Sequence, residues 1–380
     1  MSGRDCSFAS QASPENRSTS GASSHERSIS PGDNHSQGGF TLHHATPLTA
    51  TSISNSDSPE PPSINKTNNH QDLTLDGAIN FNHMELLIHA IHDKELFNLG
   101  DRVSDYSASM SLALKRGLKS PYLLHQLLAF SARHLAFLHP ECSASYFHQA
   151  VALQTRAVSL FNAAWTGVDE SNCVAILLFS VALGHHLLAD TLAKRDPGGL
   201  EGFMTHYVQC MEMHRGIHTI ATTAWPQLME SELESVLSFS SGFASRKPRG
   251  NQCQRIRELV DGADGLVEED KETCRLAIRY LQVGFDALLA EEEEQGNRYQ
   301  MIFAWTMLAP PEFTGLLAAK RPEVLVLLGY YALLLHYGRD MWQVGDAGAY
   351  ILGIIVDYLD PKWHHWLEYP REMVVNVLGH

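Results

Sequence analysis

The chain has 380 residues, of which 44% are hydrophobic, and its formal net charge is −15. This length allows one large domain or two smaller ones, and the hydrophobic content suffices for a sizeable core. An acidic chain without a basic stripe binds nucleic acid poorly on its own, so direct DNA or RNA binding is disfavoured.

Cysteine usage and hydropathy indicate the compartment. The six cysteines form no C-x-x-C pair, which is typical of a reducing compartment rather than of a disulfide framework. The N-terminus lacks the apolar stretch of a signal peptide. No segment has the roughly 20 apolar residues that span a membrane. We therefore expect a soluble intracellular protein with no membrane span.

Residues 1–78 form a Ser/Thr/Asn-rich segment that we expect to be a disordered tail. Its apolar residues are isolated, so it cannot bury enough surface to offset the entropy of ordering. Residues 1–80 carry four basic and eight acidic side chains, and the tail is therefore acidic as well. An all-helical domain is expected over residues 79–380.

The first part of that domain begins with a helix whose predicted inward stripe is Met84, Leu87, Ile88 and Ile91. Residues 93–119 are predicted to be a mobile connection. A helix from Pro121 to Pro140 and a second one over 146–160 then form an antiparallel hairpin. The inward face of the first hairpin helix is predicted at leucines 124, 127, 128, 135 and 138.

Residues 172–190, NCVAILLFSVALGHHLLAD, predict a central helix. The segment is apolar on all sides from Cys173 to Leu183, so it has no solvent face and must lie inside the domain. His185, His186 and Asp190 come too early for a membrane span. The neighbouring amphipathic helices are expected to pack on it.

The second half predicts further helices, separated by Pro and Gly breakers. They are expected over residues 200–223 with Pro226 as the stop, then 228–239, 268–290, 322–337 and 341–359, and a last helix starting at Pro370. Residues 240–251 are predicted to be a loop that holds the one local basic cluster, Arg246, Lys247 and Arg249. No alternating strand pattern is present. The sequence therefore predicts an all-α fold: a single large multi-helix domain with a disordered N-terminal tail.

The candidate metal ligands are His206, Cys210 and His214, with His218 one step further. Side chains at i and i+4 share a helix face, and His-x3-His is a familiar half-site for zinc. Each step overshoots a helical turn by about 40°, so a single helix supplies only two or three ligands. Partly buried polar residues without a metal are the alternative interpretation, and no cofactor is predicted.

An apolar ligand site is a second candidate, in the aromatic-rich C-terminal third. Aromatic residues and glycines between buried helices can line such a pocket. The residues proposed for it are Tyr331, His336, Trp342, Gly345 and Gly348. An ordinary aromatic core is the alternative interpretation.

Catalytic signatures are missing from the sequence. It has no GxSxG, P-loop, GxGxxG or HExxH motif. We therefore expect a chain that is not an enzyme and has no catalytic residues. An all-helical enzyme or metal-binding protein centred on His206, Cys210 and His214 is the alternative.

Several segments carry a family resemblance. In chain order they are LLHQLLAFSARHLAFLHPE, YFHQAVALQTRAVSLFN, NCVAILLFSVALGHHLLAD, RPEVLVLLGYYALLLHYG, MWQVGDAG and WHHWLEYP. Together they resemble the regulatory region of fungal zinc-cluster transcription factors, in particular the sterol-uptake-control type. The resemblance covers about residues 80–375.

The resemblance implies a nuclear transcription regulator, shared with the cytoplasm, that controls sterol or secondary-metabolite genes. The family places a six-cysteine zinc cluster before a linker and this helical region. Here Cys6 stands without a C-x-x-C or a basic run, so we expect no zinc cluster and no direct DNA binding. The expected partners are a DNA-binding transcription factor or a second copy, paired through apolar helices of the 324–335 kind, and an apolar small molecule.

Overall fold

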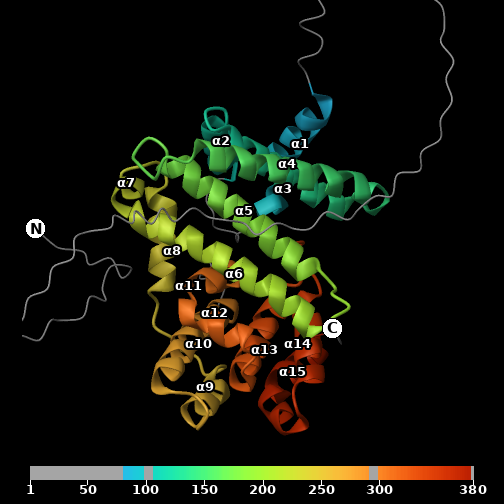
Figure 1. The fold of residues 1–380 in the computed structure, drawn as a ribbon, viewed down its shortest axis with the longest axis vertical. Coiled ribbons are helices and arrows are strands. Elements are labelled where there is room, and N and C mark those ends of the chain that lie inside the picture. Colours follow the sequence, from blue (N-terminus) through green and yellow to red (C-terminus); the bar gives the residue numbers. More distant parts are fainter. Residues whose placement is uncertain (1–79, 98–105, 291–297, 378–380) are drawn as a thin grey trace, which may run out of the picture. The chain divides into compact units, whose positions relative to one another are not determined.

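The computed structural model describes residues 80–97, 106–290 and 298–377, without the side chains of residues 376 and 377. These ranges contain fifteen α-helices and no strand (Figure 1). The predicted all-α, multi-helix fold is therefore confirmed. The predicted disordered tail, residues 1–78, lies outside the described residues, and the domain boundary at residue 79 stays a prediction.

The described helices have the following bounds. Those in the first part of the chain are α1 Phe81–His92, α2 Tyr106–Gly117, α3 Pro121–Leu138, α4 Ser143–Ala164, α5 Cys173–Ala193, α6 Leu200–Thr223, α7 Trp225–Met229 and α8 Glu234–Ala244. Those in the second part are α9 Gln254–Asp261, α10 Glu268–Leu288, α11 Gln300–Leu308, α12 Pro311–Ala318, α13 Pro322–Tyr337, α14 Ala347–Tyr358 and α15 Glu368–Val377. Short 3-10 helices are η1 Lys94–Phe97, η2 Pro140–Cys142 and η4 Pro361–Leu367.

Helix α5 is the predicted central helix, and the structure confirms this position. It packs against α3, which precedes it in the chain, and against α6, which follows it. Among the described helices, α5 alone is long and apolar enough to cross a membrane, but 78% of its apolar window is buried inside the protein. Its apolar side chains are thus covered by neighbouring helices, as expected for a core helix.

Helices α3 and α4 form the predicted antiparallel hairpin, joined by η2. The inward face of α3 is largely as predicted, with Leu127, Leu128 and Leu135 buried. Leu138 was expected to face inward but is 43% exposed. It is the last residue of α3.

Helix α13 is the second strongly apolar helix and is buried from Glu323 to His336. It packs closely with α14 and also contacts α10 and α15. The expectation that an apolar helix of this kind pairs with a partner protein is therefore wrong for residues 324–335. Their apolar surface is already covered within the chain.

Two expectations for the first helices are wrong. The buried residues of α1 are Leu86 and Ala90, whereas Met84, Ile88 and Ile91 are exposed. Residues 93–119 were expected to be a mobile connection, but they contain η1 and α2. Residues 98–105, between these two helices, lie outside the described ranges. Serine and alanine dominate α2, so its packing residues are too weakly apolar to form a clear sequence pattern.

Several boundaries in the second half also differ. Pro226 lies in the first turn of α7, because proline is tolerated where helical N–H groups need no partner. Helix α8 continues to Ala244, which shortens the predicted basic loop. Helix α14 starts at Ala347 because Gly345 has a φ of +50°. Helix α15 starts at Glu368, two residues before Pro370.

Candidate metal and ligand sites

Tyr331, the first of the predicted ligand-binding residues, is a buried core side chain. Its hydroxyl donates to the carbonyl oxygen of Ile302 at 2.7 Å. Its ring stacks on Trp305, with centroids 4.4 Å apart, and Tyr207 lies beside it. Burial raises the pKa of Tyr331 far above its ordinary value. The hydroxyl is therefore neutral and already has a partner.

Gly348 and His336 lie at the contact between α13 and α14. A Cβ added to Gly348 would lie 2.5 Å from His336 N and would also overlap the carbonyl oxygen of Ala332. Only glycine allows the two helices to approach so closely. His336 is 2% exposed, and neither of its ring nitrogens has a hydrogen-bond partner. Burial lowers the pKa of His336 and favours the neutral ring.

Trp342 faces a different part of the molecule. Its Nε1–H donates to the carbonyl oxygens of Glu95 and Leu96, at 3.0 and 3.2 Å. Its ring stacks on His134, with centroids 4.7 Å apart. Because Tyr331 and Trp342 contact different neighbours, the predicted ligand-binding residues divide between two environments. Gly345 lies in the turn before α14, with a φ of +50°. That the five residues share one ligand site stays a prediction.

Two of the predicted metal ligands, Cys210 and His214, lie in contact on α6. Cys210 Sγ is 3.9 Å from His214 Nε2, and that nitrogen also lies 2.9 Å from the carbonyl oxygen of Gly184. Burial raises the pKa of Cys210 to about 12 and lowers the pKa of His214 to about 4. The thiol is therefore protonated, whereas a metal ligand must be a thiolate.

His206, the third predicted ligand, points away from that pair. Its Nε2 contacts Lys194 Nζ and lies 3.8 Å from Asp196 Oδ2. The structure thus brings Cys210 and His214 together and places His206 beside an acidic side chain of the preceding loop. Zinc binding by these three residues stays a prediction.

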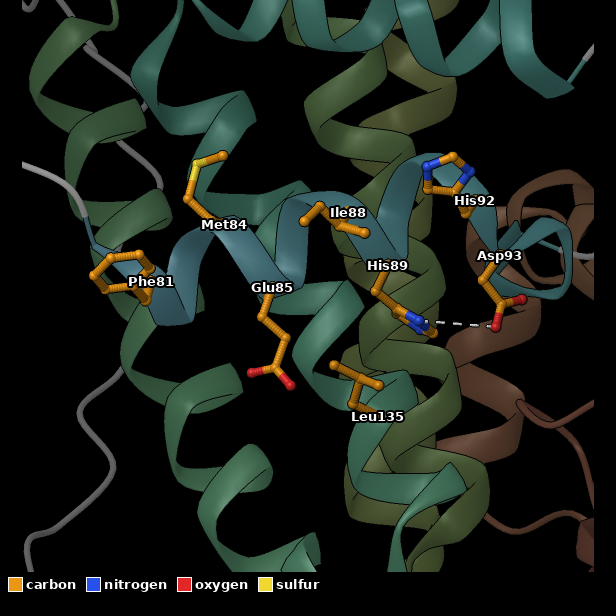
Figure 2. A pocket seen from close by; sticks show the side chains of 8 residues that line it. All are labelled: Phe81, Met84, Glu85, Ile88, His89, His92, Asp93 and Leu135. Atoms are coloured by element: carbon orange, nitrogen blue, oxygen red, sulfur yellow. Dashed lines mark ion pairs between the residues drawn. The ribbon is translucent and has the colours of Figure 1, made fainter.

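A pocket of about 650 Å³ lies along α1. Figure 2 shows the side chains that line it. It is lined by apolar residues and by several titratable ones: Phe81, Met84, Glu85, Ile88, His89, His92, Asp93 and Leu135. Phe81 is 80% exposed and Ile88 is 54% exposed. Met84 and Ile88, two of the four residues that the sequence suggested for the core, therefore line an open surface pocket instead.

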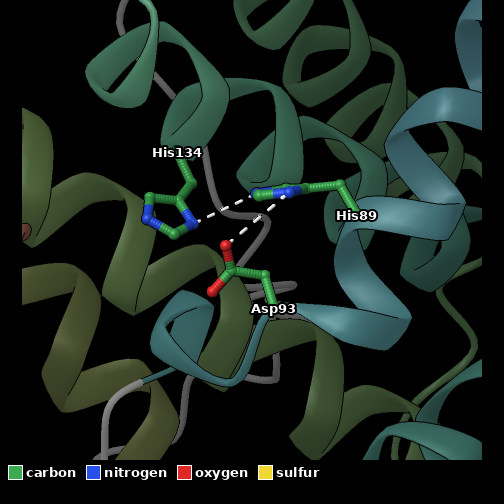
Figure 3. A group of neighbouring side chains, drawn as sticks. All are labelled: His89, Asp93 and His134. Atoms are coloured by element: carbon green, nitrogen blue, oxygen red, sulfur yellow. Dashed lines mark hydrogen bonds and ion pairs between the residues drawn. The ribbon is translucent and has the colours of Figure 1, made fainter.

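Three side chains of types that can ligate a metal lie next to one another: His89, Asp93 and His134 (Figure 3). Two of them, His89 and Asp93, line this pocket. One ligand atom from each lies within 4.8 Å of the other two, which holds for no other set of three His, Cys, Asp or Glu residues in the described ranges. His89 Nε2 is 3.1 Å from His134 Nδ1. The second ring nitrogen of His89, Nδ1, is 3.8 Å from Asp93 Oδ2.

Local structure positions each of these three groups. His89 is in the last turn of α1, and Asp93 caps the C-terminus of that helix. The other carboxylate oxygen of Asp93 accepts the backbone N–H of Glu95 at 2.9 Å, which fixes the side chain at the start of η1. His134 is 1% exposed on α3, where Trp342 stacks on its ring.

Both imidazoles are held in the neutral state. Burial lowers the pKa of His134 to about 4, and the nearby charge of Asp93 opposes this only in part. Burial also lowers the pKa of His89, against the opposing charges of Asp93 and Glu85. Near neutral pH both rings therefore offer a lone pair, as metal ligation requires.

Known proteins were compared with the chain as a sequence, independently of this cluster. No family model matches the chain. It is 22% identical over 271 residues to a Gibberella zeae protein described as a Zn(2)-C6 fungal-type transcription factor. The chain is thus similar, at low identity, to a fungal zinc-cluster transcription factor.

The match covers 67% of this chain and 53% of the Gibberella zeae protein, so the chain spans about half the length of that relative. The predicted resemblance to fungal zinc-cluster transcription factors is supported at this general level. The sterol-uptake-control type and the missing zinc cluster stay predictions.

Proposed function

We propose that this chain is the regulatory part of a fungal transcription regulator that acts in the nucleus, with a share in the cytoplasm. Its target genes would be those of sterol or secondary-metabolite biosynthesis. The observation that carries the proposal is the similarity to a fungal Zn(2)-C6 transcription factor along two thirds of the chain. The all-helical fold is consistent with the regulatory region that the sequence segments resemble.

The regulator would reach its genes through a DNA-binding partner or a second copy that supplies the DNA contacts. Specific DNA binding rests on several Lys/Arg–phosphate contacts together with base readout. The local basic cluster is a poor candidate for this, because the backbone N–H groups of Arg249 and Gly250 are bound by Asp286, at 2.6 and 2.9 Å. An acidic carboxylate thus lies directly beneath the loop.

A deletion strain tests the proposed role. Transcript levels would be compared between wild type, the deletion and the deletion complemented with the full chain, under sterol limitation and under metabolite-producing conditions. We expect a set of sterol or secondary-metabolite transcripts to change and to recover on complementation. A deletion transcriptome that matches wild type in both conditions would refute the proposed function.

The DNA-binding part has its own test. In a gel shift with purified full-length chain and the responsive promoters at about 150 mM salt, the physiological ionic strength, we expect no sequence-specific shift. A specific nanomolar shift without a partner would show that the chain binds DNA directly. If the purified chain gives no shift, nuclear extract from the deletion strain is added to distinguish a missing partner from inactive protein. A shift that needs both the chain and the extract shows that a partner is required.

The proposed apolar effector is testable by thermal shift. A ligand that binds only the folded state must raise the melting temperature. We expect a sterol to do so in a dose-dependent manner, and a sugar of similar mass to have no effect. If the pocket along α1 holds the sterol, Ile88→Ser should abolish the shift and Tyr331→Phe should leave it intact. The reverse pattern would place the ligand in the C-terminal third.

A further inference from the structure

We propose that His89, Asp93 and His134 bind one divalent first-row transition-metal ion, of which Zn²⁺ is the probe used below. Two imidazoles and a carboxylate form a donor set that suits zinc and ferrous iron, whereas calcium and magnesium prefer oxygen ligands alone. The proposal concerns a site on α1 and α3 and does not depend on the role in transcription.

The spacing of the two imidazoles fits one ion. Zinc–nitrogen bonds of 2.0–2.1 Å in a tetrahedral site place two nitrogen ligands about 3.3 Å apart. The nitrogens of His89 and His134 that face each other are 3.1 Å apart. The carboxylate of Asp93 adds a negative charge, which offsets the charge of a divalent cation in this partly buried place.

The site is held in place by contacts outside it. Trp342 stacks on the ring of His134, and the backbone N–H of Glu95 holds the carboxylate of Asp93. A site whose ligands are already oriented loses less entropy when the ion binds. Arg133 is the nearby positive charge that opposes a cation, but its guanidinium is engaged by Asp190 at 2.5 Å.

The pocket along α1 provides access. His89 and Asp93 line it, and neither is fully buried, so an ion can enter from solvent. Three protein ligands leave one tetrahedral position for water or for a group inside the pocket, which is the arrangement of open zinc sites. An ion bound here would also link α1 and η1 to α3. Its ligands Asp93 and His134 are 41 residues apart in sequence.

The test uses untagged full-length chain, stripped of metal with a chelator and then titrated with zinc by calorimetry. Elemental analysis after gel filtration gives the stoichiometry. We expect about one zinc per chain at this site, with Kd at least tenfold weaker in Asp93→Asn. Asparagine keeps an oxygen that accepts the N–H of Glu95 but loses the charge. His89→Ala and His134→Ala should lose the site.

Two controls separate this site from others. His83→Ala removes a histidine from α1 outside the cluster, and Cys210→Ser removes a ligand of the set predicted on α6. Both should bind zinc like wild type. If His134→Ala fails to fold, as judged by circular dichroism, Asp93→Asn and His89→Ala decide the question. Zinc that is absent from the wild type, or retained equally in Asp93→Asn and His89→Ala, would overturn the proposal.

A parallel titration with Fe²⁺ under anaerobic conditions distinguishes the two metals that this donor set accepts. Binding of zinc at lower concentration than iron assigns a zinc site, and the opposite order assigns an iron site. Either order supports the proposal when Asp93→Asn weakens the binding. If the wild type binds zinc and iron no more tightly than Asp93→Asn does, the proposed metal site is refuted. This holds whatever the transcription phenotype of the deletion strain.

Discussion

His89 and His134 are 45 residues apart in sequence, yet their Nε2 and Nδ1 atoms lie 3.1 Å apart. The contact joins the last turn of α1 to a buried position in the C-terminal half of α3. It adds to the packing of Leu86 and Ala90, the buried residues of α1, and to the hydrogen bond that Ser131 donates to the carbonyl oxygen of Leu86 at 2.7 Å. Changes at the histidine pair should therefore be visible in nearby reporters.

Trp342 is such a reporter. Its ring lies on that of His134, and a cation on the imidazole should quench its fluorescence. We expect zinc to lower the emission of the wild type with a break at about one equivalent. Trp342→Phe should still bind zinc but show no change. Trp165→Phe, which removes an exposed tryptophan elsewhere, should behave like wild type; loss of the signal in this control would assign it to another site.

Acid should unfold this protein in a defined pH range. Burial lowers the pKa of His185 to about 3 and the pKa of His186 and His214 to about 4. In the unfolded chain each pKa returns to about 6.5. Between these values the unfolded state binds protons that the folded state excludes, so stability falls as the pH falls. The free energy of unfolding, measured in urea, should fall by about 2 kcal/mol for each histidine between pH 8 and pH 5.

His185→Phe isolates one of these contributions. His185 Nδ1 has no hydrogen-bond partner, and the rings of Phe97, Phe130 and Phe303 surround the side chain. Phenylalanine therefore suits the position and cannot be protonated. We expect the loss of stability from pH 8 to pH 5 to shrink by about 2 kcal/mol. An unchanged loss would mean that His185 is solvated or protonated in the folded state.

Gly348→Ala should destabilise the domain strongly. The added Cβ would overlap the backbone of α13 at Ala332 and His336, and both helices would have to separate. A loss of about 3 kcal/mol is expected in urea unfolding. Gly353→Ala is the matched control on the same helix, because nothing lies within 4 Å of its added Cβ. It should be neutral or stabilise by up to about 1 kcal/mol.

Gln282 should be sensitive for a different reason. Its buried amide accepts the backbone N–H of Cys253 at 2.8 Å and donates to Gln252 and Asp286. Gln282→Leu would leave the N–H of Cys253 buried without a partner, at a cost of about 1–3 kcal/mol. Gln254→Leu, on the exposed side of α9, removes only a surface contact and should change stability by less than about 0.5 kcal/mol.

The sequence predicted the helices that are apolar on all sides or bounded by strong breakers. Residues 172–190 and the segment after Pro322 have no polar face, so a central position was the one arrangement that covers them. The start of α3 at Pro121 and the end of α6 at Thr223 followed from local chemistry as well. Helix α2 was missed because its small side chains give little hydrophobic contrast.

The cluster of His89, Asp93 and His134 could not be predicted from the sequence, for a physical reason. His89 and Asp93 have the i, i+4 spacing that can mark a half-site, but the third ligand comes from α3 and is fixed by tertiary packing alone. At His206, Cys210 and His214 the regular spacing predicted a second site. The structure brings Cys210 and His214 into contact and places His206 beside Asp196, and zinc binding by these residues stays a prediction.

The contact between Trp342 and η1 has a consequence for protein synthesis. Leu96 is fully buried, and its carbonyl oxygen accepts hydrogen bonds from Trp342 and from Gln343, some 246 residues later in the chain. At typical elongation rates that length takes about 12–50 s to translate. During that interval Met110 and Phe130, which share a buried cluster with Leu96, are already made, but η1 lacks the ring of Trp342 and the hydrogen bonds from Trp342 and Gln343. A nascent chain stalled before Trp342 should therefore bind chaperones at η1, and a full-length chain released from the ribosome should not.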